Sequence, residues 1–295
     1  MNAFSAGWLA LREPFDREAR AAAGASFDLK GLAARLRGEA SALTVLDLAC
    51  GTGANLRELA PRLGGVQRWT LVDHDPRLLA AVPGVSAPWA RAAGLSMTTS
   101  AGGLCFEGPA SRVEVELLRG DLARPLDPAL PGRHRLVTAS ALLDLVSARW
   151  IDALAVRAHE AEAALLFALS VDGRALWQPS LRDDDGVHRL FAAHQRRDKG
   201  FGPALGGDAA QWAATRLSSL GYEVTQAASD WHIDGRDGAH SVAMLRAMVE
   251  GAAAAAIEQD PSAAPWIRDW TARRLDRLER TTLRVGHRDL LATLP

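Results

Sequence analysis

One segment decides the fold: Val45-Leu-Asp-Leu-Ala-Cys-Gly-Thr-Gly-Ala-Asn-Leu-Arg-Glu-Leu-Ala60. Its first four residues are apolar except for one acid, which is typical of a buried parallel strand. Gly51 and Gly53 follow, and then a helix with Leu56 and Leu59 on one face. Glycines at such a turn let the backbone approach a ligand, and the start of the helix supplies free N–H groups. The segment therefore predicts a nucleotide site, against the alternative of an ordinary tight turn.

Two acids favour the nucleotide site over the ordinary turn. Asp47 lies inside the apolar strand, where a carboxylate needs a specific reason to be buried. Thr70-Leu-Val-Asp73 is a second apolar strand, and its acid comes 20 residues after Gly53. An acid in that position can hold the two hydroxyls of a ribose. The dinucleotide fingerprint also requires a small residue where Leu56 stands, so NAD fits this turn poorly.

Four motifs resemble those of the class I S-adenosylmethionine-dependent methyltransferases. The segment 45–60 resembles their motif I, and Leu71-Val-Asp-His-Asp-Pro76 resembles motif II. Gly120-Asp-Leu122 resembles motif III, and Ser140-Ala-Leu-Leu-Asp144 occupies the place of motif IV. The resemblance covers the strands of the core and implies a Rossmann-like, doubly wound α/β fold. It further implies a seven-stranded sheet, mostly parallel with an antiparallel last strand, and S-adenosyl-L-methionine as the cofactor.

The same resemblance implies which residues bind the cofactor. Asp73 is expected to hold the ribose, Asp121 to accept from the adenine amine with Leu122 against the ring, and Ser140 to contact the methionine part. N-terminal helices often close over the cofactor in this family, so Arg12 is a candidate partner for its carboxylate. The alternative is that Arg12 lies on a helix that only packs on the sheet. The full expected set is Asp47, Ala49, Gly51, Gly53, Asp73, His74, Asp121, Leu122, Ser140 and Arg12.

Composition narrows the class of protein. The chain has 295 residues, a hydrophobic content of 48% and a net charge of −1. The nearly balanced charge argues against nucleic acid as a partner. Cys50 and Cys105 form neither a disulfide framework nor a zinc pattern, and no metal site is predicted. We find no signal peptide and no apolar run of membrane-spanning length, so a cytoplasmic protein without a membrane partner is expected.

Periodicity divides the chain into a core and additions. Asp75 and Pro76 are expected to open a helix after the second strand, residues 84–111 form an irregular excursion with room for a short hairpin, and Asp208 with Gln211 forms a capping box. The predicted strands are 43–48, 68–73, 113–119, 135–139, 164–171, 222–227 and 282–285. The predicted domains are an N-terminal helical cap, 1–38; a core, 39–236 and 281–295, with an insert at 173–207; and a helical cap insertion, 237–280.

The additions are expected to meet at one edge of the sheet. Parallel strands deliver their C-terminal ends to the edge where ligands bind, here called the ligand edge. The insert 173–207 starts there, and the helices of 237–280 connect a strand that ends there to one that begins there. Met244, Met248, Trp266 and Trp270 are thus expected to help cover the site. His287 is expected to lie down the last strand, away from it.

Methyl transfer to a hydroxyl usually needs a proton acceptor. His188, His194 and His232 are candidates by location, and His194 leads because it adjoins a basic cluster, Arg196, Arg197 and Lys199. That cluster suggests an anionic substrate, against the alternative of a solvated helix end. Asp144 either faces the substrate or orients the turn before Ser147. The acidic run 183–185 is expected to be a solvated loop.

These observations favour a methyltransferase that acts on a small molecule by in-line transfer within a capped pocket. The alternative is a protein that binds S-adenosylmethionine without transferring its methyl group, either as a scaffold or as a non-methylating enzyme on the same fold. The acceptor atom, the need for a general base and the oligomeric state stay open.

Overall fold

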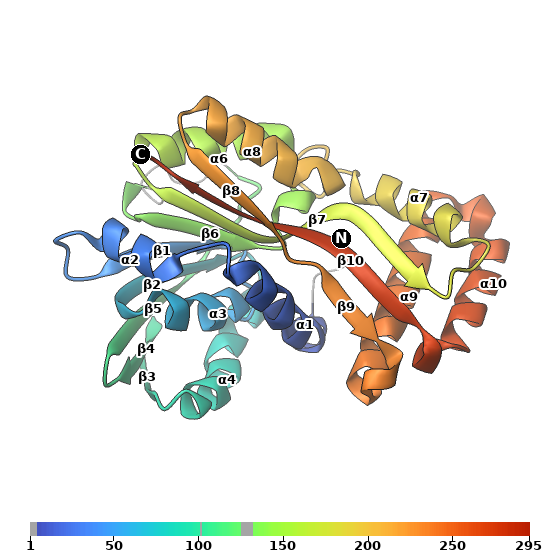
Figure 1. Ribbon diagram of the computed structural model, residues 1–295, viewed down its shortest axis with the longest axis horizontal. Coiled ribbons are helices and arrows are strands. Elements are labelled where there is room, and N and C mark those ends of the chain that lie inside the picture. The colour runs from blue at the N-terminus through green and yellow to red at the C-terminus, as the bar shows by residue number, and fades with distance from the viewer. Residues whose placement is uncertain (1–4, 101, 125–131) are drawn as a thin grey trace.

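A computed structural model describes residues 5–100, 102–124 and 132–295. A single twisted sheet runs through the molecule, with helices on both faces and a further group beyond one edge (Figure 1). The strands are β1 (Leu43–Leu48), β2 (Gly65–Asp73), β3 (Ser96–Ser100), β4 (Gly103–Gly108), β5 (Ser111–Arg119), β6 (Leu136–Ser140), β7 (Ala164–Gln178), β8 (Glu223–Ala228), β9 (Trp231–Asp234) and β10 (Thr282–Thr293). The α-helices are α1 (Ala6–Gly24), α2 (Leu29–Arg37), α3 (Ala54–Leu63), α4 (Pro76–Ala92), α6 (Ala148–Glu160), α7 (Asp184–Gln195), α8 (Ala209–Ser219), α9 (Ala239–Gln259) and α10 (Ala264–Leu275).

The strand order confirms the Rossmann-like fold. It runs β3-β4-β5-β2-β1-β6-β7-β10-β8, and β9 also pairs with β10. Strands β5, β2, β1, β6 and β7 are mutually parallel, whereas β10 is antiparallel to both of its neighbours. The seven expected strands are therefore present, with the last one antiparallel. Among the described residues, three more strands extend the sheet: the hairpin β3–β4 beside β5, and β9 on β10.

The region predicted as an irregular excursion, 84–111, is largely regular. Asp75 caps α4 through a 2.8 Å bond from the Arg77 N–H, as expected, but the helix continues to Ala92. The hairpin β3–β4 then adds to the edge of the sheet, where Phe106 packs edge-on against Trp89. Residue 101 of this region and residues 1–4 of the predicted N-terminal cap lie outside the described residues.

Successive side chains of the central strands point to opposite faces of the sheet and pack in two hydrophobic cores. Val45 packs with residues of α2, α3 and α4 on one face, and Leu46 and Leu48 pack with residues of α6 and α8 on the other. This is the pattern expected of a parallel strand covered on both faces. No helix in the described part of the chain is long and apolar enough to cross a membrane.

The largest departure from expectation is the length of β7 and β10. Strand β6 ends at Ser140, which pairs with Ala168, whereas β7 continues to Gln178. Its partner β10 runs over the whole of 282–293 instead of ending near residue 285. The residues predicted to open the 173–207 insert thus extend the sheet past the ligand edge. The predicted strand ended at residue 171, so Asp172, Gly173 and Arg174 were expected outside the sheet. The local sequence pattern does not show that these residues pair with β10.

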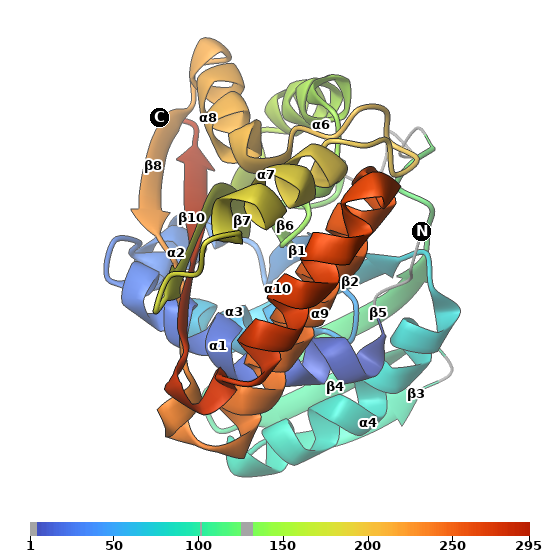
Figure 2. The ribbon, with the colours of Figure 1, turned by 90° about the vertical axis from the view of Figure 1, so that its right-hand side faces the viewer.

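A third core lies on this extension. Residues of α1, α7, α9 and α10 pack there with β7, β9 and β10, and Figure 2 shows α7, α9 and α10 in front of the sheet. Met244 and Trp270 are fully buried inside this core. The acidic run is not a solvated loop: Asp184 accepts from Trp270 Nε1 at 2.8 Å and binds the fully buried guanidinium of Arg274.

Candidate functional site

The glycine turn after β1 has the geometry of a ligand cradle. Gly51 and Gly53 have φ values of 56° and 81°, in the region that side chains disfavour. Gly53 is the N-cap of α3 and makes no side-chain cap, so the first N–H groups of the helix are not capped by a side chain. Such a helix start attracts the negative groups of a ligand.

Backbone strain is concentrated at the ligand edge. Four non-glycine residues in the described part of the chain have φ between 52° and 54°, and three of them are Ala49, Ala141 and Leu169. Strands β1, β6 and β7 are neighbours, and their register puts these three residues side by side where β1 and β6 end. Each such conformation costs about 1–3 kcal/mol, and residues of this kind cluster at functional sites.

Asp47 lies beneath the turn in a buried polar network. Its Oδ1 accepts from Asn55 Nδ2 at 2.7 Å, and Asn55 Oδ1 accepts from the buried Arg20 at 2.7 Å. Asp47 is fully buried, and its Oδ2 has no hydrogen-bond partner within the described residues. Burial raises the pKa of Asp47 to about 7. The residue thus supports the turn from below, which the sequence alone did not distinguish from direct cofactor contact.

Asp73 lies at the tip of β2 and reaches the glycine turn. Its Oδ2 accepts from the Gly51 N–H at 2.9 Å, and its Oδ1 accepts from the Asp75 N–H at 2.9 Å. Each carboxylate oxygen can accept a second hydrogen bond. His74 is largely exposed beside it, with Nδ1 at 3.4 Å from Asp73 Oδ1.

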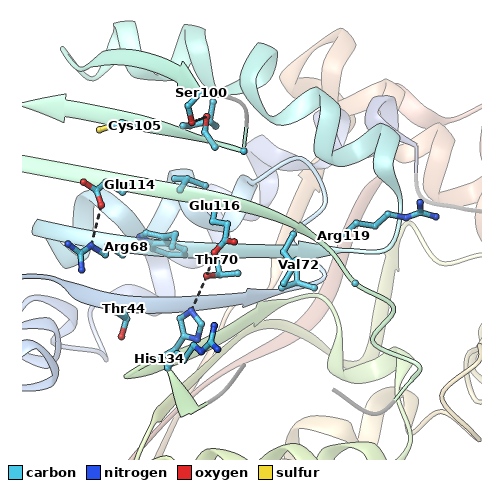
Figure 3. Close-up of a pocket in the computed structure, with 18 of the residues that line it drawn as sticks. Thr44, Arg68, Thr70, Val72, Ser100, Cys105, Glu114, Glu116, Arg119 and His134 are labelled. Carbon is cyan, nitrogen blue, oxygen red and sulfur yellow. Dashed lines mark hydrogen bonds and ion pairs between the residues drawn. The ribbon is translucent and has the colours of Figure 1, made fainter. Parts of the chain in front are cut away.

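The third strand tip borders a pocket of about 1060 Å³. Asp121 and Leu122 lie at one end of it, and the rest follows the face of β2 and β5 (Figure 3). That face carries Thr70 and Glu116, and Thr70 Oγ1 lies 3.0 Å from His134 Nε2. Leu122 is buried in the second core. Most of the pocket therefore lies along the sheet face, and only its Asp121 end adjoins the ligand edge.

Asp144 is the acid nearest the end of β6. It is 6% exposed, and its Oδ1 has no hydrogen-bond partner among the described residues. Burial raises the pKa of Asp144 to about 6, while the positive charges of Arg12 and Lys199 act in the opposite direction. Residues from α1, the β6 end and the 173–207 insert thus meet here. An unsatisfied buried carboxylate favours the interpretation that Asp144 faces a ligand.

Helix α1 crosses the ligand edge. A Cβ added to Gly51 would lie 2.9 Å from Leu9 Cδ1, so Leu9 packs directly on the glycine turn. Arg12 is not free for a cofactor carboxylate in this structure, because its Nε and Nη2 donate to Asp16 at 2.9 and 3.1 Å. The Arg12 guanidinium also stacks 4.9 Å from the Trp231 ring. The position of Arg12 agrees with a helix that closes over the site. Its guanidinium, however, is bonded to protein side chains.

Arg196 and Arg197 of the basic cluster are exposed, whereas His194 and Lys199 are partly buried. Arg196 pairs with Asp208 at 2.6 Å, and Arg197 and His194 contact Glu258 at 2.8 and 3.4 Å. Asp208 therefore forms no capping box, and its side chain makes no cap to α8.

His232 lies exposed on β9, between the buried residues Trp231 and Ile233. These placements do not support His194 or His232 as proton acceptors. Lys199, which donates to the Gln195 carbonyl, is the cation of the cluster that is electrostatically coupled to Asp144.

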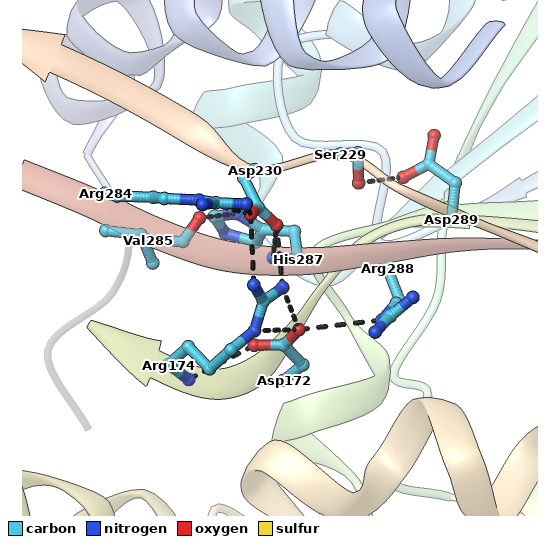
Figure 4. A network of polar contacts seen from close by, with 9 residues as sticks. All are labelled: Asp172, Arg174, Ser229, Asp230, Arg284, Val285, His287, Arg288 and Asp289. Atoms are coloured by element: carbon cyan, nitrogen blue, oxygen red, sulfur yellow. Dashed lines mark hydrogen bonds and ion pairs between the residues drawn. The ribbon is translucent and has the colours of Figure 1, made fainter. Parts of the chain in front are cut away.

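The position of His287 differs from the prediction that it lies down the last strand, away from the site. Because β7 and β10 extend past the ligand edge, His287 pairs with Val171, three residues beyond Ala168. It therefore lies at the level of the ligand edge rather than far down the strand. Sequence reasoning missed it, together with Asp230 and Asp289 (Figure 4), because only the paired length of β10 brings them there. The one sequence signal for these positions was the alternation of polar residues along the last strand. Asn55, which α3 places beside Asp47, was also not singled out.

The residues present fit S-adenosylmethionine. The glycine turn offers N–H groups and space for backbone contact, and Asp73 keeps two acceptor positions for a diol. Nine buried side-chain polar atoms in the described part of the chain have no hydrogen-bond partner, and two of them belong to acids at this edge, Asp47 Oδ2 and Asp144 Oδ1. Unsatisfied buried acids at one edge are expected where a polar ligand binds.

Comparison with known proteins gives structural neighbours only. No family model and no curated protein matches the sequence. An O-methyltransferase family protein from Burkholderia thailandensis is 14% identical over 88% of this chain and 55% of that chain, with a TM-score of 0.38. The chain thus spans 55% of the length of that protein.

Two other solved structures cover more of the neighbour. A protein from Galdieria sulphuraria, assigned as a sarcosine dimethylglycine methyltransferase, is 10% identical over 90% of this chain and 83% of that one, with a TM-score of 0.43. A methyltransferase from Geobacter sulfurreducens, in complex with S-adenosyl-L-homocysteine, is 17% identical over 94% and 97%, with a TM-score of 0.38. The function is therefore inferred from the site of this chain.

Proposed function

We propose that this chain is an S-adenosylmethionine-dependent methyltransferase that acts on a small molecule. The observation that carries the proposal is the convergence at one sheet edge of the glycine turn, the strained residues Ala49, Ala141 and Leu169, and the unsatisfied acid Asp144. Strain of this kind persists only where the surrounding structure holds it, and it is concentrated where a ligand is bound.

The cofactor-binding roles follow from position. Asp73 accepts the ribose hydroxyls with its remaining lone pairs, and the N–H groups of the first turn of α3, which no side chain caps, face the ligand. Asp121 lies where the adenine amine is expected, and Ser140 lies where the methionine part is expected. Ala49 and His74 flank the cofactor as neighbours of the turn and of Asp73. Asp47 acts through Asn55, and Arg12 acts as part of the closing helix.

When bound, the cofactor supplies a methyl group on a sulfonium, which an aligned nucleophile displaces. The chain has to orient the acceptor and exclude water. Helices α1, α7, α9 and α10 pack on the β7–β10 extension beyond the ligand edge (Figure 2). A cap built from these elements favours a small substrate over a macromolecule. We retain the predicted domains, with 237–280 as a cap insertion, as part of this proposal.

The experiment is calorimetry with S-adenosyl-L-homocysteine. Asp73→Ala is expected to weaken binding by about 2–3 kcal/mol, the contribution of two hydrogen bonds to a charged group. Asp75→Ala is the matched control, because that acid lies on the same loop and its side chain binds only Arg77 in the described residues. Equal affinities of the two variants would remove Asp73 from the site, and wild-type protein that binds NAD instead would refute the proposal.

Methyl transfer is tested separately from binding. A labelled methyl group of S-adenosylmethionine should appear in a small-molecule product. Tight cofactor binding without any labelled product in a metabolite extract would favour the alternative, a binding protein or a non-methylating enzyme.

A further inference from the structure

The pocket of about 1060 Å³ is a groove on the sheet face opposite α4. Val113 and Val115 of β5 point into the first core, where α4 packs, whereas Glu114, Glu116 and Leu118 of the same strand line the groove. Figure 3 shows these side chains along β5 and the neighbouring β2. Because successive residues of a strand face opposite sides, the strand ladder fixes the positions of the groove side chains.

The strand register divides the groove into three levels. Each level is one pair of residues from β2 and β5: in order from the ligand edge, Val72 with Leu118, Thr70 with Glu116, and Arg68 with Glu114. Successive levels are two residues apart, about 6.6 Å along a strand. The groove therefore changes from apolar to polar to charged over about 13 Å. Its apolar surface is Leu118, which is partly exposed and packs on the second core.

Ion pairs within the protein neutralise the charges at both ends of the groove. At the charged level, Arg68 Nε donates to Glu114 at 3.2 Å, and Arg112 Nε donates to the same carboxylate at 3.0 Å. At the ligand edge, Arg124 Nε lies 3.4 Å from Asp121 Oδ2. A charged ligand that bound at either end would have to displace one of these partners.

Glu116, at the middle level, differs from the other acids of the groove. It makes no ion pair in the part of the chain that the structure describes, and its hydrogen bond there is long, with Thr70 Oγ1 3.5 Å from Oε2. Thr70 Oγ1 lies closer to the buried His134, at 3.0 Å from Nε2. A carboxylate accepts about four hydrogen bonds, so Glu116 keeps acceptor positions for a ligand.

A glycine keeps the space beside Glu116 open. Gly103 of β4 pairs with Glu116 in the ladder, and a Cβ on Gly103 would lie 2.0 Å from the Val115 carbonyl oxygen. The backbone at this position therefore excludes every side chain. The next residue across the sheet at this level is Ser100 of β3, which pairs with Gly103. Glu116 is thus bordered on that side by backbone and a small hydroxyl side chain.

We propose that this groove is a second small-molecule site, and that its ligand is an amine with an apolar body. The ammonium group donates to Glu116, and the apolar body lies on Leu118, one level nearer the ligand edge. The spacing of about 6.6 Å between these levels suits an aromatic ring joined to the amine through two carbons. An ammonium supplies the charge and the donors that the unpaired carboxylate lacks. The site lies beyond Asp121, away from the end of β6, so its ligand is not the methyl acceptor and the inference does not require methyl transfer.

Two arginines of the groove favour the competing ligand class, an anion. Arg119 and Arg133 make no ion pair within the described residues, and both are exposed. Figure 3 shows Arg119 at the end of β5, pointing away from Thr70 and Glu116. An anion placed at the middle level would be repelled by the Glu116 carboxylate. A cation at Glu116 is therefore the ligand that the middle of the groove favours, and anion binding is the contrary outcome of the test.

The first test titrates 2-phenylethylamine into the wild-type protein and follows the backbone amides by NMR. The amide resonances of Thr70, Gly103 and Glu116 should shift and saturate, with a Kd of about 1–10 mM, as expected for a fragment of this size. The anion 3-phenylpropanoate and the ringless ethylamine should bind at least about tenfold more weakly. No saturable shift with 2-phenylethylamine, or equal binding of the anion, would overturn the proposal. Shifts confined to Ala141 and Asp144 would place the amine at the acceptor site and overturn it as well.

The second test removes the charge of Glu116. Glu116→Gln should weaken binding of 2-phenylethylamine about tenfold, as the loss of a charge-assisted contact does, and added salt should reduce the difference because the site is open. Glu107→Gln is the control, because Glu107 is an exposed acid of β4 that pairs with Arg112 and does not line the groove. Equal affinities of the two variants would overturn this inference alone. Wild-type protein that binds the amine but not S-adenosyl-L-homocysteine would instead refute the proposed function and leave this site in place.

Discussion

Leu9 of α1 packs against Gly51, so that a Cβ on the glycine would lie 2.9 Å from Leu9 Cδ1. The apolar side chain thus occupies space beside the turn where the cofactor is expected. Pro14 lies inside α1 between Leu9 and Arg20, the residue that anchors the second half of the helix to Asn55. A proline inside a helix removes one backbone hydrogen bond.

Leu9→Ala is expected to tighten binding of S-adenosyl-L-homocysteine, because less apolar contact has to be given up. The gain should be up to about tenfold in Kd, or ~1.4 kcal/mol. Leu11→Ala is the control, since Leu11 lies on the same helix but packs on the third core. Calorimetry that shows weaker binding for Leu9→Ala than for Leu11→Ala would mean that Leu9 contacts the bound cofactor instead.

Asp47 should make stability dependent on pH. Folding raises its pKa from 3.8 to about 7, so between these values the folded chain keeps a proton that the unfolded chain has lost. The free energy of unfolding therefore falls as pH rises through this window. Asp47→Asn removes the titration and should stabilise the protein at pH 8 by as much as about 4 kcal/mol.

The effect of Asp47→Asn should be small near pH 4, where the carboxyl is protonated in the folded chain and close to half protonated in the unfolded chain. Urea unfolding at both pH values measures it. Asp269→Asn, an exposed acid on α10, should change little at either pH. A stabilisation by Asp47→Asn that is equal at both pH values would show that the buried charge is not its cause.

Two glycine-to-alanine substitutions should have opposite signs. Gly286→Ala places a Cβ 2.1 Å from Asp172 Oδ1 and should destabilise the fold by about 2–3 kcal/mol. Gly251→Ala lies inside α9 with nothing within 4 Å of its Cβ and should stabilise by about 0.5–1 kcal/mol. Thermal unfolding compares the two, and a neutral Gly286→Ala would show that this position tolerates a side chain.

Lys199→Ala tests the charge of the substrate. If the acceptor carries an anion near Asp144, loss of this cation should raise the substrate KM by about 5- to 10-fold, as for a charge-assisted contact. Cofactor affinity should not change. Arg196→Ala is the control, because Arg196 is already paired with Asp208 on the surface. Equal KM values for both variants would mean that the substrate needs no positive partner here.

Sequence reasoning recovered the features that depend on nearby residues. The strand 43–48, the glycine turn and the cap of α4 by Asp75 are encoded within a few positions of each other, and each is present. The mostly parallel sheet with an antiparallel last strand was implied by the resemblance of the motifs to a known family, and the strand order agrees with it.

Features that depend on distant partners were missed. Strand β7 continues to Gln178 because β10 pairs with it 100 residues later, and Asp172 is stabilised there by Arg174 and Arg288. Asp208 was predicted to cap α8, but it pairs with Arg196 instead. His287 was predicted to lie away from the site for the same reason. The position of a residue along the last strand relative to its neighbours depends on the strand register, which the sequence pattern does not show.

Helix α1 contacts both the glycine turn and the third core through different side chains. Leu9 lies on the cofactor turn, whereas Arg12 and Asp16 contact Trp231, and the Leu11 carbonyl lies 2.9 Å from His240 of α9. A ligand that moves the helix at one end therefore changes the free energy of binding at the other. Thermodynamic linkage makes that effect reciprocal, so the acceptor must strengthen or weaken cofactor binding by the same factor.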